Sequence, residues 1–168
     1  MITFILSNFT LTFLILGLIF SGIAIARAPK PLALDVIVEK LLSWYVFFSV
    51  GVCYLYNAIV HIFFGKMAAA FIGSDSPFQF EVGTASLGFS IIGFIAAFRS
   101  FDLRLGAVIP FSIFTLGAAV GHVREMITAG NFAPGNASVI FYTDLVIPAF
   151  GLLLLWLQWR CGRPAGAK

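Results

Sequence analysis

Charged side chains are scarce in this sequence: lysine, arginine, aspartate and glutamate together make up 10% of its 168 residues. Soluble domains carry about 25% charged residues. Hydrophobic residues make up 61% of the chain, and 20 of them are phenylalanine. A chain with so little polar surface cannot cover itself in water, so the composition excludes a soluble domain and predicts an integral membrane protein.

Cysteines and clustered basic residues are also few. The only two cysteines are Cys53, inside an apolar run, and Cys161, at the end of the last run, so neither a disulfide framework nor a thiolate metal site is predicted. The net charge of +3 is small, and the basic residues are scattered along the chain. That distribution does not form the basic face of a nucleic-acid-binding protein.

What the chain does contain is five apolar runs, each long enough for the roughly 20 residues that a membrane-spanning helix needs. They cover about residues 2–26, 36–64, 77–98, 104–129 and 138–159. We therefore expect an all-α fold with a single transmembrane domain over residues 1–168, in which the last four helices form a four-helix core and the first packs outside it. The first run ends in AIARA, which resembles a signal-peptide cleavage site, but it lacks a basic start and is too long for one.

Lysine and arginine are distributed unequally between the two sides that these runs define. One side has Lys66 alone, and Arg124 lies within the fourth run; the other side has the remaining eight, Arg27, Lys30, Lys40, Arg99, Arg104, Arg160, Arg163 and Lys168. Because cytoplasmic loops are enriched in basic residues, we expect the N-terminus outside and the C-terminus inside. Glu39 and Lys40 are interpreted as boundary residues, and Asp102 as a loop ion pair with Arg99 and Arg104.

Five ionisable residues from four different runs fall at one depth, in roughly the outer third of the bilayer at 1.5 Å per residue. They are His61, Glu81, His122, Glu125 and Asp144. Each such group costs at least about 2.5–3.5 kcal/mol at the centre of a membrane helix, and such groups usually face the bundle interior and mark function. The shared depth predicts a buried site near the outer, periplasmic face.

The first hypothesis for this site is a divalent metal, iron, manganese or zinc, because imidazoles and carboxylates suit these ions. The predicted ligands are the five residues just named, supported by Tyr54, Asn57 and Tyr142. His122 and Glu125 reverse the Glu-x-x-His order of paired-metal bundles, which leaves a mononuclear or irregular two-metal site open. If the protein is a metal-dependent membrane enzyme, a carboxylate not bound to the metal would act as general base for a metal-bound water.

Two alternatives remain open for the same residues. Chains of aspartate, glutamate and histidine also form proton relays in pumps and transporters, so the chain could be a proton-conducting or ion-transporting component. Deeper in the bundle, however, the runs offer Thr84, Ser86, Ser90 and Thr115 but no carboxylate. The other alternative is structural: histidine–carboxylate pairs satisfy one another and only lock the bundle.

The segments YNAIVHIFFG, FQFEVGTASLGF, GHVREM and FYTDLVIPAFGLLLL together resemble a family of small, uncharacterised bacterial inner-membrane proteins, over about residues 40–158. The resemblance implies a multi-pass protein of the cell inner membrane with no established activity, and it assigns no catalytic residue. The expected surroundings are membrane lipid and no nucleic acid, with a homo-oligomer or a larger membrane complex left open.

Overall fold

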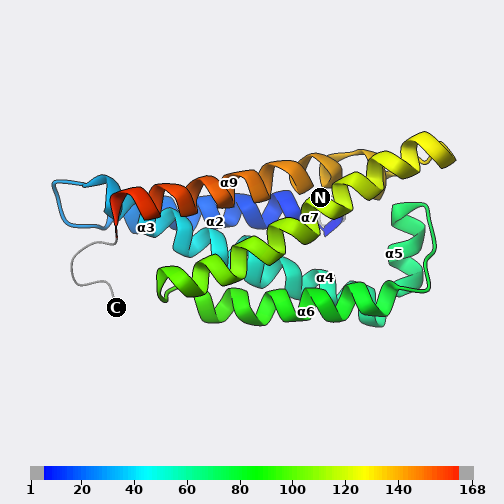
Figure 1. The fold of residues 1–168 in the computed structure, drawn as a ribbon, viewed down its shortest axis with the longest axis horizontal. Coiled ribbons are helices and arrows are strands. Elements are labelled where there is room, and N and C mark those ends of the chain that lie inside the picture. The colour runs from blue at the N-terminus through cyan, green and yellow to red at the C-terminus, as the bar shows by residue number, and fades with distance from the viewer. Residues whose placement is uncertain (1–5, 163–168) are drawn as a thin grey trace.

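The structure, a computed structural model, describes residues 6–162, and all regular secondary structure within them is helical. The helices shown in Figure 1 are α2 (Phe9–Ala26), α3 (Leu34–Tyr45), η1 (Val46–Val52), α4 (Cys53–Phe63), α5 (Gly65–Ile72), α6 (Gln79–Ala96), α7 (Phe101–Ala129), α8 (Pro134–Ala137) and α9 (Val139–Cys161). The all-α prediction is confirmed. Residues 2–5 of the first predicted run, and Arg163 and Lys168, lie outside the described residues.

Five of the described helices are long and apolar enough to cross a membrane, and they match the five predicted runs. They are Phe9–Ala26, Leu34–Phe63, Gln79–Ala96, Phe101–Ala129 and Pro134–Cys161. The second span is continuous through α3, η1 and α4, where η1 is a π-helical segment of 7 residues. A π-helical segment changes the direction in which the following side chains point, and such segments are frequent at functional sites.

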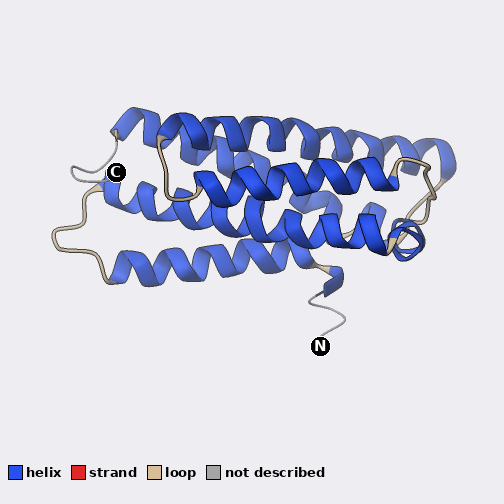
Figure 2. Ribbon diagram, turned by 90° about the horizontal axis from the view of Figure 1, so that it is seen from below, coloured by secondary structure: helices blue, strands red, loops and turns tan. Residues whose placement is uncertain are grey.

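The spans run along the long axis of an elongated bundle, and Figure 2 shows them alongside one another. Since successive spans are antiparallel, their connections gather at two ends. We call the end with connections 27–33 and 97–100 the Arg104 end, and the end with connections 64–78 and 130–138 the His122 end. The short helix α5 lies across the His122 end (Figure 1).

The spans pack in pairs, with α4 on α6, α7 on α9 and α2 on α3. Where η1 crosses α6, Gly93 has no room for a side chain, because a Cβ atom there would lie 2.7 Å from the backbone nitrogen of Gly51. The fully buried core comes from the second span, α6, α7 and α9, while α2 contributes only partly buried Phe9, Phe13 and Leu14.

Candidate functional site

His122 and Asp144 form an ion pair across the α7–α9 interface at the His122 end. The Nε2 atom of His122 lies 3.3 Å from Oδ2 of Asp144, and the two side chains are 13% and 9% exposed. Of the five residues predicted from their common depth, these two are brought together directly. The pair is buried enough to exclude most solvent, yet it lies within a few residues of the helix ends.

Asn136, which is fully buried, fixes the orientation of the His122 ring. Its Nδ2 atom donates to the carbonyl oxygens of His122, at 3.3 Å, and of Asn131, at 2.7 Å. Its Oδ1 atom therefore faces the imidazole and accepts a hydrogen bond from Nδ1 of His122, at 2.6 Å. Since an amide oxygen can only accept, Nδ1 of His122 carries a hydrogen.

This arrangement leaves one proton between His122 and Asp144. With Nδ1 protonated, Nε2 of a neutral ring is an acceptor, and an ionised carboxylate is also an acceptor. Their contact is attractive only if a further proton resides on either Nε2 or the carboxyl group. The pair can therefore hold a single proton as imidazolium and carboxylate, or as neutral imidazole and carboxylic acid.

The short helix α8 positions Asn136 against α5. A Cβ atom on Gly135 would lie 2.6 Å from Cδ1 of Phe71, so only glycine permits this approach. The side chain of Asn131 donates to the carbonyl oxygen of Ile72, at 3.0 Å, and ties the 130–138 connection to the end of α5. The α5–α8 contact thus holds Asn136 and, through it, the His122 ring.

The other predicted site residues lie elsewhere. His61 binds Gln79, with 2.6 Å between Nδ1 and Oε1, on the α4–α6 side of the bundle. Glu81 is exposed and Glu125 is half-buried. Among residues 6–162, no group of three or more histidine, cysteine, aspartate or glutamate side chains lies close enough to hold a metal ion.

The supporting residues are also divided between the two helix pairs. Asn57 donates to Oγ of Ser86, at 2.9 Å, beside His61, and Tyr142 is 63% exposed. Tyr54 contacts Oγ1 of Thr115 on α7, at 2.9 Å. Depth along a helix predicts how far a residue lies from the membrane surface but not which neighbour its side chain faces, and α4 faces α6 while α7 faces α9.

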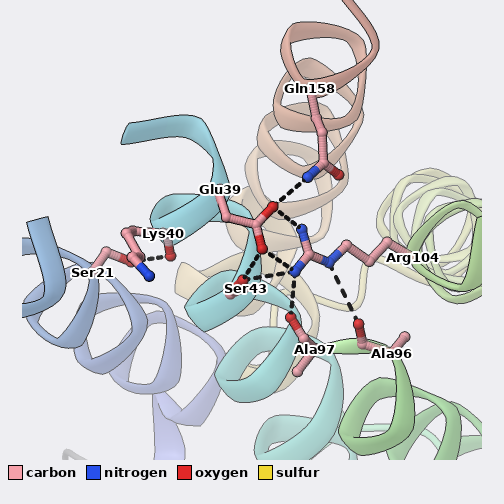
Figure 3. Close-up of polar contacts among 8 residues, drawn as sticks. All are labelled: Ser21, Glu39, Lys40, Ser43, Ala96, Ala97, Arg104 and Gln158. Carbon is pink, nitrogen blue, oxygen red and sulfur yellow. Dashed lines mark hydrogen bonds and ion pairs between the residues drawn. The ribbon is translucent and has the colours of Figure 1, made fainter. Parts of the chain in front are cut away.

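A second polar cluster, at the Arg104 end, was not predicted as a site. The Arg104 guanidinium is fully buried and binds both carboxylate oxygens of Glu39, at 2.7 and 2.8 Å. It also donates to Ser43 and to the backbone carbonyls of Ala96 and Ala97, where α6 ends, and Gln158 donates to Glu39 at 2.6 Å (Figure 3). We call Glu39, Ser43, Arg104 and Gln158 the Arg104 network.

The interpretation of Glu39 as a boundary residue, and of Asp102 as the ion-pair partner of Arg104, was therefore wrong. Asp102 is exposed, whereas Glu39 is 8% exposed. The sequence did contain a signal: Glu39 and Ser43 are four residues apart on one helical face, and Arg104 and Gln158 lie at the same end of their spans. The shared-depth criterion, applied to this end of the runs as well, would have grouped them.

Comparison with known proteins assigns the chain to a family. A model of a family of unknown function, DUF6790, matches residues 7–164. No curated protein matches the chain, and neither does any solved structure.

Proposed function

The chain belongs to this family of unknown function, and we propose that it is a proton-binding transport component of a membrane, with His122 and Asp144 holding the transferred proton. The observation that carries the proposal is the 3.3 Å contact between Nε2 of His122 and Oδ2 of Asp144, together with the hydrogen bond between Nδ1 and Asn136, from which we infer one shared proton. Ionisable groups that face one another inside membrane bundles are typical of proton pathways.

Buried hydroxyl groups extend from the pair toward the bundle centre. The Thr115 hydroxyl donates to the carbonyl oxygen of Phe111, at 2.8 Å, so it accepts from Tyr54. Nearer the Arg104 end, the hydroxyls of Ser49 and Ser112 are buried and have no hydrogen-bond partner among residues 6–162. These groups supply polar positions in a part of the bundle where none of the carboxylates of residues 6–162 lies, and this supports a proton path.

The proposed setting is the cell inner membrane, with the N-terminus outside, the C-terminus inside and the His122 end facing outward. Exposed Arg27, Lys30, Arg99 and Arg160 at the Arg104 end support this orientation. We also propose that the second span, α6, α7 and α9 form the functional four-helix core, with α2 peripheral to it, because α2 supplies none of the fully buried core residues.

Proton flux through reconstituted vesicles tests the proposal. Under an imposed membrane potential, the native protein should acidify or alkalinise the vesicle interior, and Asp144→Asn should abolish that flux. Asp102→Asn is the matched control, because it removes an exposed carboxylate from the other end of the bundle. Flux that survives Asp144→Asn, or falls equally in both variants, would contradict the proposal.

One observation also favours the second candidate function, a divalent-metal site. Two ligands of one tetrahedral metal, each about 2.0–2.1 Å from it, are separated by roughly the distance between Nε2 of His122 and Oδ2 of Asp144. With only two protein ligands in place, water would have to complete the set. Iron, manganese or zinc near one equivalent in protein purified without chelator, and lost in Asp144→Ala, would favour this candidate over proton transfer.

A further inference from the structure

An apolar groove runs along the outer surface of α2 and α3, toward the Arg104 end. It encloses about 550 Å³ and is lined by Phe20, Ile23, Ala24, Arg27 and Trp44. The four residues from the α2 segment follow the i, i+3, i+4, i+7 spacing of one helical face. From Phe20 to Arg27 the groove extends about 10 Å along the helix, at 1.5 Å per residue.

The walls of this groove are held by packing, so the groove is preformed. The rings of Phe20 and Trp44 have centroids 5.1 Å apart, and Trp44 meets Phe98 edge-on at 5.3 Å. Behind the rings, the Ser21 hydroxyl contacts the carbonyl oxygen of Lys40, at 3.4 Å (Figure 3). A rigid aromatic wall keeps its shape without a ligand, which lowers the entropic cost of binding an apolar chain.

Arg27 places a positive charge at one end of the groove. It directly follows α2, at the point where the apolar span Phe9–Ala26 ends, so in a membrane it would lie at the level of the lipid headgroups. Its side chain is exposed, and among residues 6–162 no carboxylate forms an ion pair with it. Lys40 lies one turn before Trp44 on the same face of α3, and a lysine there can extend its ammonium toward the headgroups.

We propose that this groove binds one acyl chain of an anionic phospholipid, whose phosphate pairs with Arg27 and with Lys40 as a second cation. The groove faces outward from helices apolar enough to span a membrane, so lipid is its surrounding medium. The apolar floor fits an acyl chain, and the guanidinium fits the phosphate in a two-point contact. This site is separate from the His122–Asp144 pair and does not depend on the proposed proton transfer.

Tryptophan quenching tests this proposal directly. Replacing Trp156 and Trp159 by phenylalanine leaves Trp44 as the only tryptophan in the chain. This protein is reconstituted into phosphatidylcholine vesicles with small added fractions of either phosphatidylglycerol or phosphatidylcholine carrying brominated acyl chains. Because each basic residue near a membrane surface favours anionic lipid about fivefold, the brominated phosphatidylglycerol should quench Trp44 at a mole fraction lower by at least about fivefold.

Two variants and one control separate the contributions. Arg27→Gln should lower the preference for phosphatidylglycerol about fivefold, while Ala24→Phe, which fills the groove without changing charge, should weaken quenching by that lipid. Arg160→Gln removes another exposed arginine at the same end and should leave the preference unchanged. Equal quenching by both lipids in the Trp44-only protein, or a preference that Arg27→Gln leaves intact, would overturn the proposal.

Discussion

The two ends of the bundle use ionisable residues in different ways. At the Arg104 end, a fully buried guanidinium meets a carboxylate in a two-point contact, and Ser43, Gln158 and two backbone carbonyls complete the network. At the His122 end, a histidine meets an aspartate through a single contact of 3.3 Å, to which we assign one shared proton. An arginine cannot release its proton, so the first arrangement is a fixed lock, whereas the second can change its protonation.

The same two helices, α7 and α9, contribute residues to both arrangements. On α7, Arg104 and His122 are 18 residues apart, which is about five turns and about 27 Å along one face. On α9, Asp144 and Gln158 are likewise on one face. The distance is close to the roughly 30 Å hydrocarbon thickness of a bilayer. Burial of an ionisable group in a membrane helix therefore does not by itself mark a functional site. The chemistry of the group and its partner determines whether the pair can change its protonation.

The largest expected effect is on stability at the Arg104 end. Arg104→Met leaves Glu39 buried without its ion-pair partner, and breaking one side of a buried pair costs about 3–5 kcal/mol. We expect a large loss of thermal stability in detergent. Glu39→Met added to Arg104→Met should restore most of it, because replacing both charges by apolar side chains is often neutral. A double variant no more stable than Arg104→Met would show that the loss of stability does not come from an unpaired Glu39.

Asn136→Ala should have the next largest effect, and it acts at the His122 end. It removes the acceptor of His122 Nδ1 and both donors to the carbonyls of His122 and Asn131. Leaving buried polar groups unpaired costs about 1–3 kcal/mol. Proton flux should fall more than the loss of folded protein explains, because the ring is no longer held in one tautomer. Flux per folded molecule equal to that of the native protein would contradict the role assigned to Asn136.

Gly135→Ala tests whether α5 supports the His122 end. The added methyl group would lie 2.6 Å from Phe71, and such overpacking costs about 1–3 kcal/mol. The matched control is Gly117→Ala, because a Cβ atom on Gly117 meets nothing within 4 Å. Thermal melting should separate the two variants, because the added Cβ atom would also lie 2.8 Å from the backbone oxygen of Phe71, which cannot rotate away. Equal melting temperatures of the two glycine variants would show that the close α8–α5 contact does not contribute to thermal stability.

Tyr54→Phe should have the smallest effect. It keeps the ring that packs against Phe111, at 4.9 Å between centroids, and removes only the hydroxyl that contacts Thr115. We expect the free energy of unfolding to fall by about 1 kcal/mol. Proton flux should decrease by more than the loss of folded protein explains. Flux identical to that of the native protein would remove Tyr54 from the path and leave the His122–Asp144 pair as a local binding site.

Much of the fold could be predicted from the sequence, because apolar runs of spanning length leave few alternatives in a membrane. The run 104–129 predicts α7 to within three residues of its observed start, and the run 138–159 predicts α9 to within two residues at each end, whereas α2 begins at Phe9, seven residues after the start of its run. The π-helical segment η1 could not be predicted, since VFFSVGV is as apolar as the α-helical residues around it. The shared depth of His122 and Asp144 predicted that they meet.

The prediction that His61 and Glu81 join the same site was wrong, because depth along a helix does not determine the direction in which a side chain points from the helix axis. His61 faces Gln79 on α6, and Glu81 is exposed. The metal site remains a prediction resting on the two residues that do meet. The Arg104 network was overlooked because charged residues at the inner ends of spans were attributed to the positive-inside distribution, although Arg104 is 0% exposed.

Nitrogen NMR of the two histidines, His61 and His122, tests the central claim most directly, since the sequence contains only these two. In protein labelled with ¹⁵N in histidine, spectra are recorded over a range of pH. We expect His122 to carry a hydrogen on Nδ1 at every pH measured, while the signal of its Nε2 reports a proton shared with Asp144. Asp144→Asn should change the Nε2 signal of His122 and leave His61 as it is. A His122 ring with a bare Nδ1, or an Nε2 signal that Asp144→Asn does not move, would contradict the account.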